Sequence, residues 1–438
     1  MKTKLTSLWE SIRTSLWFIP ALMVIISCGL AFVLVKFDSI LASGLKIFCY
    51  TGGPEGARTI LSTIAGSMIT IAGVTFSITI VALTMASSQF GSRLLRNFMV
   101  DKSNQIVLGA FIATFIYCLL VLNALKTVDD IIYIPRIAVS FSFVLALANL
   151  GILIYFFHHV STSIQAEQVI NAVYKELKAK IDHLFEQEKE HVIPEKEIEQ
   201  QLPDFQSSSA AVCSKGCGYL RAIDREGLFK TAVQNNLVIQ LKYRAGDYVF
   251  TGTPLIAVIP DTEIDSSFED RINGCFLLGS SRSPEQDVEF AINQLVEVAL
   301  RALSPGINDP YTAMGCIDRL GDIICQLHSK KFPTPYRYDK EGHLRLVLDV
   351  FDYEGILDAA FNQIRQSAAG NVAVNLRLLE ILKVIAQSIQ NKDQYPSVKQ
   401  HAEMIYRSSK ESTKEKKDLK DIENRFQAII KVIDKRNQ

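Results

Sequence analysis

The hydrophobic pattern divides the chain into an N-terminal part with long charge-free apolar runs and a C-terminal part where short apolar stretches alternate with charged residues. The runs are Leu16–Val35, Ile60–Met85, Ile106–Leu125 and Ile137–Phe157. Each has about 20 residues or more, which lets a helix cross a hydrocarbon core of about 30 Å. The first run is too long for the apolar segment of a typical signal peptide. We therefore predict a four-helix transmembrane domain within residues 1–160.

Four spans place both termini on the same side of the membrane. Lys and Arg in the flanking segments are slightly more numerous on that side, where Lys2, Lys4 and Arg13 lie. Because cytoplasmic loops carry an excess of these residues, the pattern favours cytoplasmic termini. The lipid bilayer is thus the first predicted partner, and the predicted localisation is a multi-pass membrane protein with the N- and C-termini in the cytoplasm.

The second run carries a stripe of small and polar residues at helical spacing. It consists of Ser62, Gly66, Thr70, Gly73 and Ser77. Intervals of three and four residues place all five on one helix face. Small residues let membrane helices approach closely, so one interpretation is helix packing. The other is that stripes from several copies line a polar path. The spans lack charged residues, and a neutral path suits passive permeation better than a charged relay.

Three polar residues follow where this helix leaves the bilayer. They are Gln89, Arg93 and Arg96. Arginines at this depth are common interfacial anchors, which is one interpretation. A ring of them at a pore mouth would instead attract anions.

The rest of the chain resembles a cytosolic α+β region. Residues 161–210 are predicted to form an amphipathic stalk helix and a linker, because apolar positions at helical spacing precede a polar, Pro-containing segment. Residues 211–275 combine short apolar strands with Gly-containing turns, which predicts a small β-barrel or sandwich. Residues 276–438 show helical periodicity and are predicted to be a mostly helical cytosolic domain. The predicted fold class is therefore an α-helical membrane protein followed by this α+β region.

Charged and polar residues gather around the first helix of that last domain. Ser283, followed by Pro284 and Gln286, is predicted to cap its N-terminus. The candidate ligand or subunit contacts are Arg282, Asp287, Arg301, Asn308 and Asp309. The favoured interpretation is structural, with each residue serving as a local cap, turn or pair. The alternative is that the five converge on a polar ligand or on a neighbouring subunit. A further alternative is a membrane enzyme that uses Asp287, Arg301, Asn308 and Asp309.

Several of these segments carry a resemblance to a known family. They are Gln89-Phe90, Arg93 to Arg96, Gly218-Tyr219-Leu220, Ile223-Asp224, Gly246-Asp247, Glu285-Gln286-Asp287 and the string RALSPGINDPYTA from Arg301 to Ala313. Together they resemble the bacterial membrane-protein family labelled domain of unknown function 2254, over roughly residues 10 to 390. The resemblance implies a bacterial, inner-membrane location and this architecture. It implies no reaction, substrate or catalytic residue.

Composition narrows the classes of function. The 46 Lys+Arg balance 46 Asp+Glu, so nothing favours a nucleic-acid partner. Cys213 and Cys217 would be half of a metal site, yet neither a Cys nor a His pair nearby completes it. The usual enzyme motifs are absent from the sequence. We therefore expect no catalytic residues, no metal and no cofactor.

The function predicted from these patterns is a homo-oligomeric membrane channel or passive transporter with a cytosolic gating or ligand-binding module. Its predicted partners are further copies of the chain and a small ion or small-molecule ligand. The alternative is a membrane-anchored sensor or scaffold protein without a pore, in which the stripe only packs helices.

Overall fold

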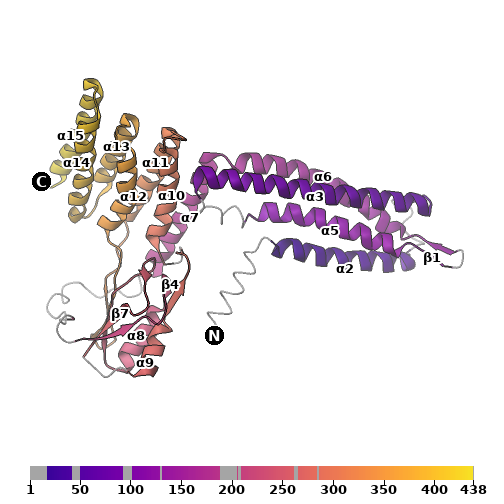
Figure 1. Cartoon of the computed structure of the whole chain (residues 1–438), viewed down its shortest axis with the longest axis horizontal. Helices are drawn as coiled ribbons and strands as arrows, with labels where there is room; N and C mark the ends of the chain where they lie inside the picture. Colours follow the sequence, from indigo (N-terminus) through magenta and orange to yellow (C-terminus); the bar gives the residue numbers. More distant parts are fainter. Residues whose placement is uncertain are drawn as a thin grey trace. The chain divides into compact units, whose positions relative to one another are not determined.

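The computed structural model describes residues 17–41, 50–91, 101–128, 131–187, 205, 209–260, 265–283 and 286–437. The chain divides into two compact units, Met1–Val169 and Ile170–Gln438 (Figure 1). Each unit has its own core and is described separately.

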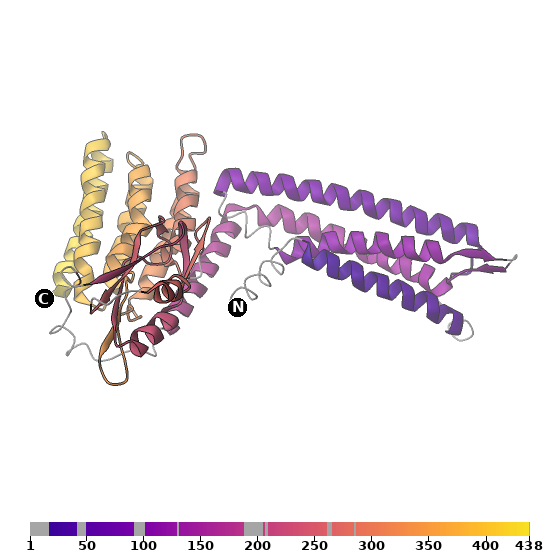
Figure 2. The same cartoon turned by 60° about the horizontal axis from the view of Figure 1, so that its bottom comes forward.

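The first unit is a bundle of four helices. They are α2 (Phe18–Leu41), α3 (Pro54–Phe90), α5 (Lys102–Ala124) and α6 (Arg136–Ser163). All four are long and apolar enough to cross a membrane, which confirms the four predicted helices. A hairpin of β1 (Lys126–Val128) and β2 (Ile131–Tyr133) connects α5 with α6. The four helices run lengthwise beside one another in both views (Figures 1 and 2).

Helix α5 lies at the centre of this bundle. It packs against α2, α3 and α6. In its most apolar segment 50% of the residues are buried, compared with 17% to 22% in the corresponding segments of the other three helices. Its Gly109 faces α2, where a Cβ atom would lie 2.7 Å from the Met23 sulfur. Asn149 of α6 donates a 2.7 Å hydrogen bond to Thr114 of α5. Because both side chains are buried, this pairing removes the cost of holding polar groups in hydrocarbon.

The β part of the second unit consists of two open sheets. The five-stranded sheet has the order β3 (Ala210–Cys213), β7 (Pro254–Ile259), β5 (Val238–Leu241), β10 (Leu344–Val347) and β9 (Tyr336–Tyr338). The three-stranded sheet has the order β6 (Tyr248–Val249), β4 (Gly218–Ile223) and β8 (Phe276–Gly279). Both sheets share one hydrophobic core with α8 (Arg225–Gln234) and α9 (Ser266–Asn273).

The predicted barrel is wrong, because neither sheet closes on itself. The five-stranded sheet is completed by β10, which pairs in parallel with β5 across about a hundred residues of intervening chain. Parallel pairing requires such a crossover, so a pattern of short strands and turns cannot reveal it. Strands β8, β9 and β10 also lie beyond residue 275, where the sequence predicted helix, so the sheets cross that predicted boundary.

The helical part of the second unit is a stack of three helical hairpins. They are α10 (Val288–Ala302) with α11 (Pro310–Leu327), α12 (Tyr353–Ser367) with α13 (Val372–Ser388), and α14 (Tyr395–Ser412) with α15 (Lys416–Asn437). Helix α10 packs on α12 and α12 on α14, while α11 packs on α13 and α13 on α15 (Figure 1). Each hairpin thus contacts its neighbours in sequence, as in helical repeat proteins.

Helix α7 (Ala166–Gln187) belongs to this stack and is not a free stalk. Its apolar face, including Val173, Leu177 and Ile181, is buried as its spacing predicts. Its polar side chains contact α11, where Asn171 accepts a 3.0 Å hydrogen bond from Arg319. Helix α7 therefore covers the outer side of the first hairpin.

The buried His328 joins three helices, and from its burial we expect the stack to lose stability in acid. Its two ring nitrogens lie 2.8 Å from the Ser388 hydroxyl and 2.9 Å from the Tyr353 hydroxyl. Burial lowers the pKa of His328 from 6.5 to about 4. The unfolded chain therefore binds more protons than the folded chain between these two values, so stability is lost as pH falls through this window.

We expect His328→Gln to flatten this dependence, because glutamine keeps hydrogen-bonding groups but does not titrate. Between pH 7.5 and 4.5 the wild-type chain should lose about 2.5 kcal/mol of unfolding free energy more than the variant. Denaturant unfolding of the full chain at both pH values measures the difference. His343→Gln is the control, because its side chain is 67% exposed. Equal losses in wild type and His328→Gln would contradict the assignment.

Candidate functional site

The five residues of the stripe all lie on the exposed side of α3 within a single chain, and we call them the α3 stripe. The face of α3 that packs on the rest of the bundle carries Ala57, Leu61, Ala65, Met68 and Ala72. At 3.6 residues per turn, this packing face and the α3 stripe point in roughly opposite directions. The described helices of the first unit therefore leave the α3 stripe uncovered.

The two glycines of the α3 stripe make no close packing contact with the residues that the structure describes. A Cβ atom added at Gly66 or at Gly73 would meet nothing within 4 Å. Gly109 of α5, in contrast, makes the close approach of α2 possible. Contacts among the described residues of one chain thus do not explain the two glycines, whereas contacts between chains or a polar path would.

Two of the three hydroxyl groups of the α3 stripe donate to carbonyl groups of their own helix. Ser62 donates to the Thr59 carbonyl at 3.0 Å, and Thr70 donates to the Gly66 carbonyl at 2.8 Å. Thr84, further along the same face, donates to Ile80 at 2.9 Å. Because the donors are satisfied on the helix, the oxygen lone pairs remain as outward-facing acceptors. Such a surface suits water or a partly dehydrated cation.

Polar residues also mark the end of the bundle where α3 stops. Gln89 is exposed in the last turn of α3, and Arg93 and Arg96 lie outside the described residues. His159 of α6 lies at the same end, with its Nε2 atom 2.6 Å from the Asp101 carboxylate. Asp101 in turn caps the N-terminus of α5 by accepting from the Ser103 amide.

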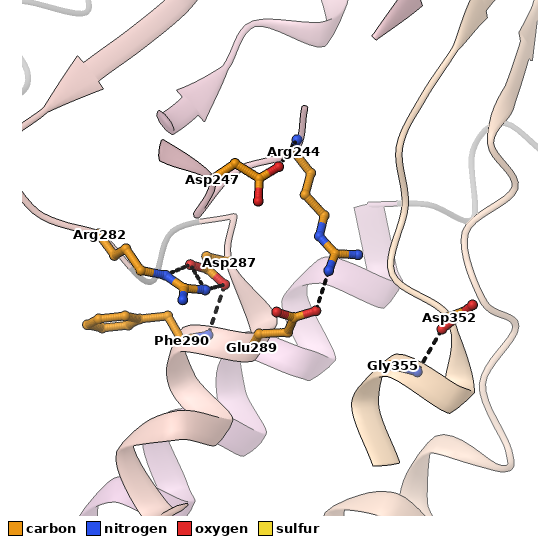
Figure 3. A network of polar contacts seen from close by, with 8 residues as sticks. All are labelled: Arg244, Asp247, Arg282, Asp287, Glu289, Phe290, Asp352 and Gly355. Carbon is orange, nitrogen blue, oxygen red and sulfur yellow. Dashed lines mark hydrogen bonds and ion pairs between the residues drawn. The ribbon is translucent and has the colours of Figure 1, made fainter. Parts of the chain in front are cut away.

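In the second unit, Asp287 is the N-cap of α10, and the predicted cap at Ser283 is wrong. The Asp287 carboxylate accepts from the Phe290 amide at 2.9 Å and from the Arg282 guanidinium at 2.7 and 2.9 Å (Figure 3). Its side chain is only 3% exposed. Ser283 is buried and its hydroxyl instead contacts the Arg221 carbonyl of β4, at 3.2 Å.

A second ion pair lies beside the first. Arg244, in the turn between β5 and β6, contacts Glu289 in the first turn of α10 at 2.5 Å, and its backbone amide donates to Asp247 (Figure 3). Gly246 in the same turn has φ +103, and a Cβ there would lie 2.3 Å from Asp287. This position therefore requires glycine both for its conformation and for the close approach.

The electrostatics of this cluster are set by burial. Burial raises the pKa of Asp287 and of Glu289, while Arg282 and Arg244 oppose the rise as counter-ions. The adjoining hollow, lined partly by Arg225 and Asp349, has room for about one water molecule. Among the described residues, no group of three or more His, Cys, Asp and Glu side chains is arranged to hold a metal. The cluster is best explained as a structural contact that holds the sheets against the start of α10. We call this contact, made by Arg244, Arg282, Gln286, Asp287 and Glu289, the joint.

The structure divides the five candidate contacts between the two ends of α10, with Arg282 and Asp287 at its start and Arg301, Asn308 and Asp309 around its end. Arg301 lies fourteen residues later on α10, which places it about 21 Å away along the axis, and it pairs with Glu297 at 3.6 Å. Asn308 has a positive φ of 49 in the following loop. Asp309 caps α11 by accepting from the Thr312 amide at 3.1 Å. These roles are local.

Two residues of the joint were missed as contacts from sequence. Arg244 lies two residues before Gly246-Asp247, which carries part of the family resemblance, but was not itself predicted as a contact. Gln286 was predicted only to help cap the N-terminus of the helix. The Gln286 side chain accepts from the Ile223 amide at 3.0 Å and donates to the Ile223 carbonyl at 3.2 Å. The Gln286 side chain thereby bonds to the backbone of β4 in the way that a neighbouring strand would. The available signal was the family resemblance, because both residues lie in or next to segments that carry it, Gly246-Asp247 and Glu285-Gln286-Asp287. These segments are far apart in sequence and meet at the start of α10.

Comparisons with known proteins agree with this resemblance. The family model described as Predicted membrane protein (DUF2254) matches residues 13–384. Similar relatives include Uncharacterized protein Rv1290c of Mycobacterium tuberculosis and Uncharacterized protein Mb1321c of Mycobacterium bovis. Each is 29% identical over 427 residues, which cover 95% of this chain and 80% of the relative. No solved structure matches the chain. The chain therefore belongs to the family described as Predicted membrane protein (DUF2254).

Proposed function

We propose that this protein is a homo-oligomeric channel or passive transporter of a small ion or small molecule, with α3 stripes from several copies lining the path. The observation that carries the proposal is the exposure of the α3 stripe on the side of α3 opposite its packing face. The second unit, joined directly to the last span, is the gating or ligand-binding module in this proposal.

The chemistry of the α3 stripe supports an aqueous or ion-coordinating path. Contact of hydroxyl groups and exposed backbone with lipid chains is only weakly favourable. Contact of the same groups with a second helix or with water is more favourable, because it provides close packing or hydrogen bonds. The outward oxygen acceptors of Ser62 and Thr70 can replace part of a hydration shell, as oxygen-lined filters do. The charge-free spans support passive permeation, because a proton relay or voltage sensor uses ionisable groups within the membrane.

The alternative function is a membrane-anchored sensor or scaffold in which the stripes meet without water between them. The stack of helical hairpins from α10 to α15 favours this candidate, since stacked repeats present extended surfaces that bind other proteins. The two functions differ in one property, which is whether water reaches the residues of the α3 stripe.

Reaction of engineered cysteines with a charged, water-soluble thiol reagent tests that property. Thr70→Cys lies on the α3 stripe, and the control Leu147→Cys lies on another span, α6, where the native side chain is 71% exposed. In membranes we expect fast labelling at position 70 and little at position 147, each measured above the wild-type level by mass spectrometry of the peptide that carries it. Equal protection of both positions would contradict a water-filled path and favour the scaffold.

A further inference from the structure

The sheets and the helical hairpins of the second unit have separate hydrophobic cores. Leu220, Ile239 and Leu346 belong to the core of the sheets, which also includes side chains of α8 and α9. In the part of the chain that the structure describes, this core contains no side chain of α10 to α15. The polar contacts of the joint therefore help to decide how firmly α10 is held against the sheets.

The bonds that cross the joint are polar and lie close to water. Arg244 of the β5–β6 turn pairs with Glu289 of α10, and their side chains are 34% and 25% exposed. The Ile223 amide of β4 donates to the Gln286 side chain at 3.0 Å. Water can replace both bonds at little net cost, because hydrogen bonds and ion pairs near the surface contribute only modestly to stability. A small change in charge can therefore shift the balance between a closed and an open joint.

Charged side chains surround a hollow in the joint that has room for about one water molecule. Asp287 and Glu289 each pair with an arginine. Asp349, in the connection between β10 and α12, makes no hydrogen bond or ion pair with the residues that the structure describes. The carboxylate of Asp349 therefore lines the hollow without a direct partner. The charged lining residues are Arg225, Arg244, Asp287, Glu289 and Asp349.

The surroundings of the hollow hold more acids than bases. Arg282 is paired with Asp287, so the Arg244 guanidinium is shared between Glu289 and Asp349 (Figure 3). Two carboxylates beside one guanidinium are incompletely neutralised, and nearby like charges disfavour the ionised form. The acids are Asp247, Asp287, Glu289, Asp349 and Asp352, and the bases are Arg225, Arg244 and Arg282.

The proton affinity of Asp349 depends on whether the joint is closed. Partial burial raises the pKa of Asp349, while Arg244 opposes the rise and Asp247 and Asp352 add to it. An open joint hydrates this carboxyl and separates it from Asp247, which returns its pKa toward the ordinary range. Proton uptake stabilises the state in which the pKa is higher. The protonated form of Asp349 therefore favours the closed joint, and the ionised form disfavours it.

We propose that Asp349 makes the joint a proton-dependent contact, which tightens when this carboxyl takes up a proton and loosens when it ionises. Asp349 lies where the chain passes from the sheets to the hairpins, so its charge acts at the place where the two parts separate. The response occurs in mild acid, above the ordinary carboxyl range near about pH 4. It does not depend on the proposed path along the α3 stripe, because all of its residues belong to the second unit.

Hydrogen exchange resolved to single amides, measured on the full chain in nanodiscs at pH 7.5 and 4.5, tests this proposal. The Ile223 amide reports on the joint, because its acceptor on Gln286 lies across it. The Val374 amide is the internal reference, because its cap, Asn371, does not titrate. The wild-type chain is compared with Asp349→Asn at each pH, so the effect of acid on His328 cancels. Asparagine has the shape of the protonated acid and cannot ionise.

At pH 7.5 we expect the Ile223 amide of Asp349→Asn to exchange about threefold more slowly than in wild type, or slower still. At pH 4.5 this difference should largely disappear, and Val374 should not differ at either pH. The matched control is Asp434→Asn, which removes an exposed acid from α15, the last helix of the stack, and should equal wild type.

Two results would overturn the proposal. Equal exchange at Ile223 in wild type and Asp349→Asn at pH 7.5 would show that this carboxylate does not loosen the joint. The same difference at both pH values would show that Asp349 only repels its neighbours and that its proton does not control the contact. Circular dichroism and elution volume equal to those of the wild type confirm that the variants are folded.

Discussion

Changing Gly66 and Gly73 together to leucine is expected to break the oligomer while leaving each protomer folded. Neither position has an atom within 4 Å of a built Cβ, so leucine fits the isolated chain, and leucine favours helix by about 1 kcal/mol over glycine. Where copies meet along the α3 stripe, each leucine overpacks a close helix contact, at about 1–3 kcal/mol per contact. That cost corresponds to roughly 5- to 150-fold weaker association for each contact.

The mass of the protein in detergent, measured by mass photometry or native mass spectrometry, reports the effect. Gly151→Leu is the matched control, because Gly151 is an exposed glycine of another span, α6, and also has nothing within 4 Å. We expect the control to keep the wild-type mass and the double variant to shift to monomer. A double variant that keeps the wild-type oligomer would show that copies do not meet at the α3 stripe.

Removing the carboxylate of Asp287 is expected to loosen the joint between the sheets and α10. Asp287→Ala leaves the Arg282 guanidinium, 24% exposed, without its partner and removes the cap from the Phe290 amide. Loss of one partner of a buried pair costs about 3–5 kcal/mol, and the partial exposure of Arg282 places this case near 3 kcal/mol. Hydrogen exchange at the start of α10 should accelerate about 100-fold, followed by mass spectrometry of the full chain.

Asp265→Ala separates the ion pair from the cap. Asp265 caps α9 through a 2.6 Å bond from the Phe268 amide, at an exposed position and with no basic partner among the contacts of the described residues. Loss of this cap alone costs about 1 kcal/mol, so exchange in α9 should rise only about fivefold. Similar acceleration in both variants would show that the Arg282–Asp287 pair adds little to the joint.

The four spans and the stripe were predictable, whereas their arrangement was not. A charge-free run identifies a span by itself, and helical spacing places Ser62 and Ser77 on one face. The central place of α5 does not follow from its apolarity, because its mean hydropathy of 2.4 equals that of α6 and is below the 2.7 of α2. It follows from close contacts such as Gly109 with Met23, which only the folded chain contains.

The joint shows why local signals can mislead. Both Ser283 and Asp287 have the chemistry of an N-cap, and the sequence favoured Ser283 because Pro284 and Gln286 follow it. In the fold, the hydroxyl of Ser283 and the amide of Gln286 contact the backbone of β4, so the cap falls to Asp287. Contacts between segments about 60 residues apart therefore decide a choice that neighbouring residues leave open.

The central claim is that the α3 stripe forms a water-filled path between copies of this chain, and ion flux in liposomes tests it most directly. Wild-type protein is reconstituted at known density, and the release of K⁺ and of Cl⁻ is followed with separate indicators. We expect the release of at least one ion to exceed that of protein-free liposomes and to disappear in the Gly66→Leu, Gly73→Leu double variant. Liposomes that contain folded wild-type oligomer and remain as tight to both ions as protein-free liposomes would contradict the claim.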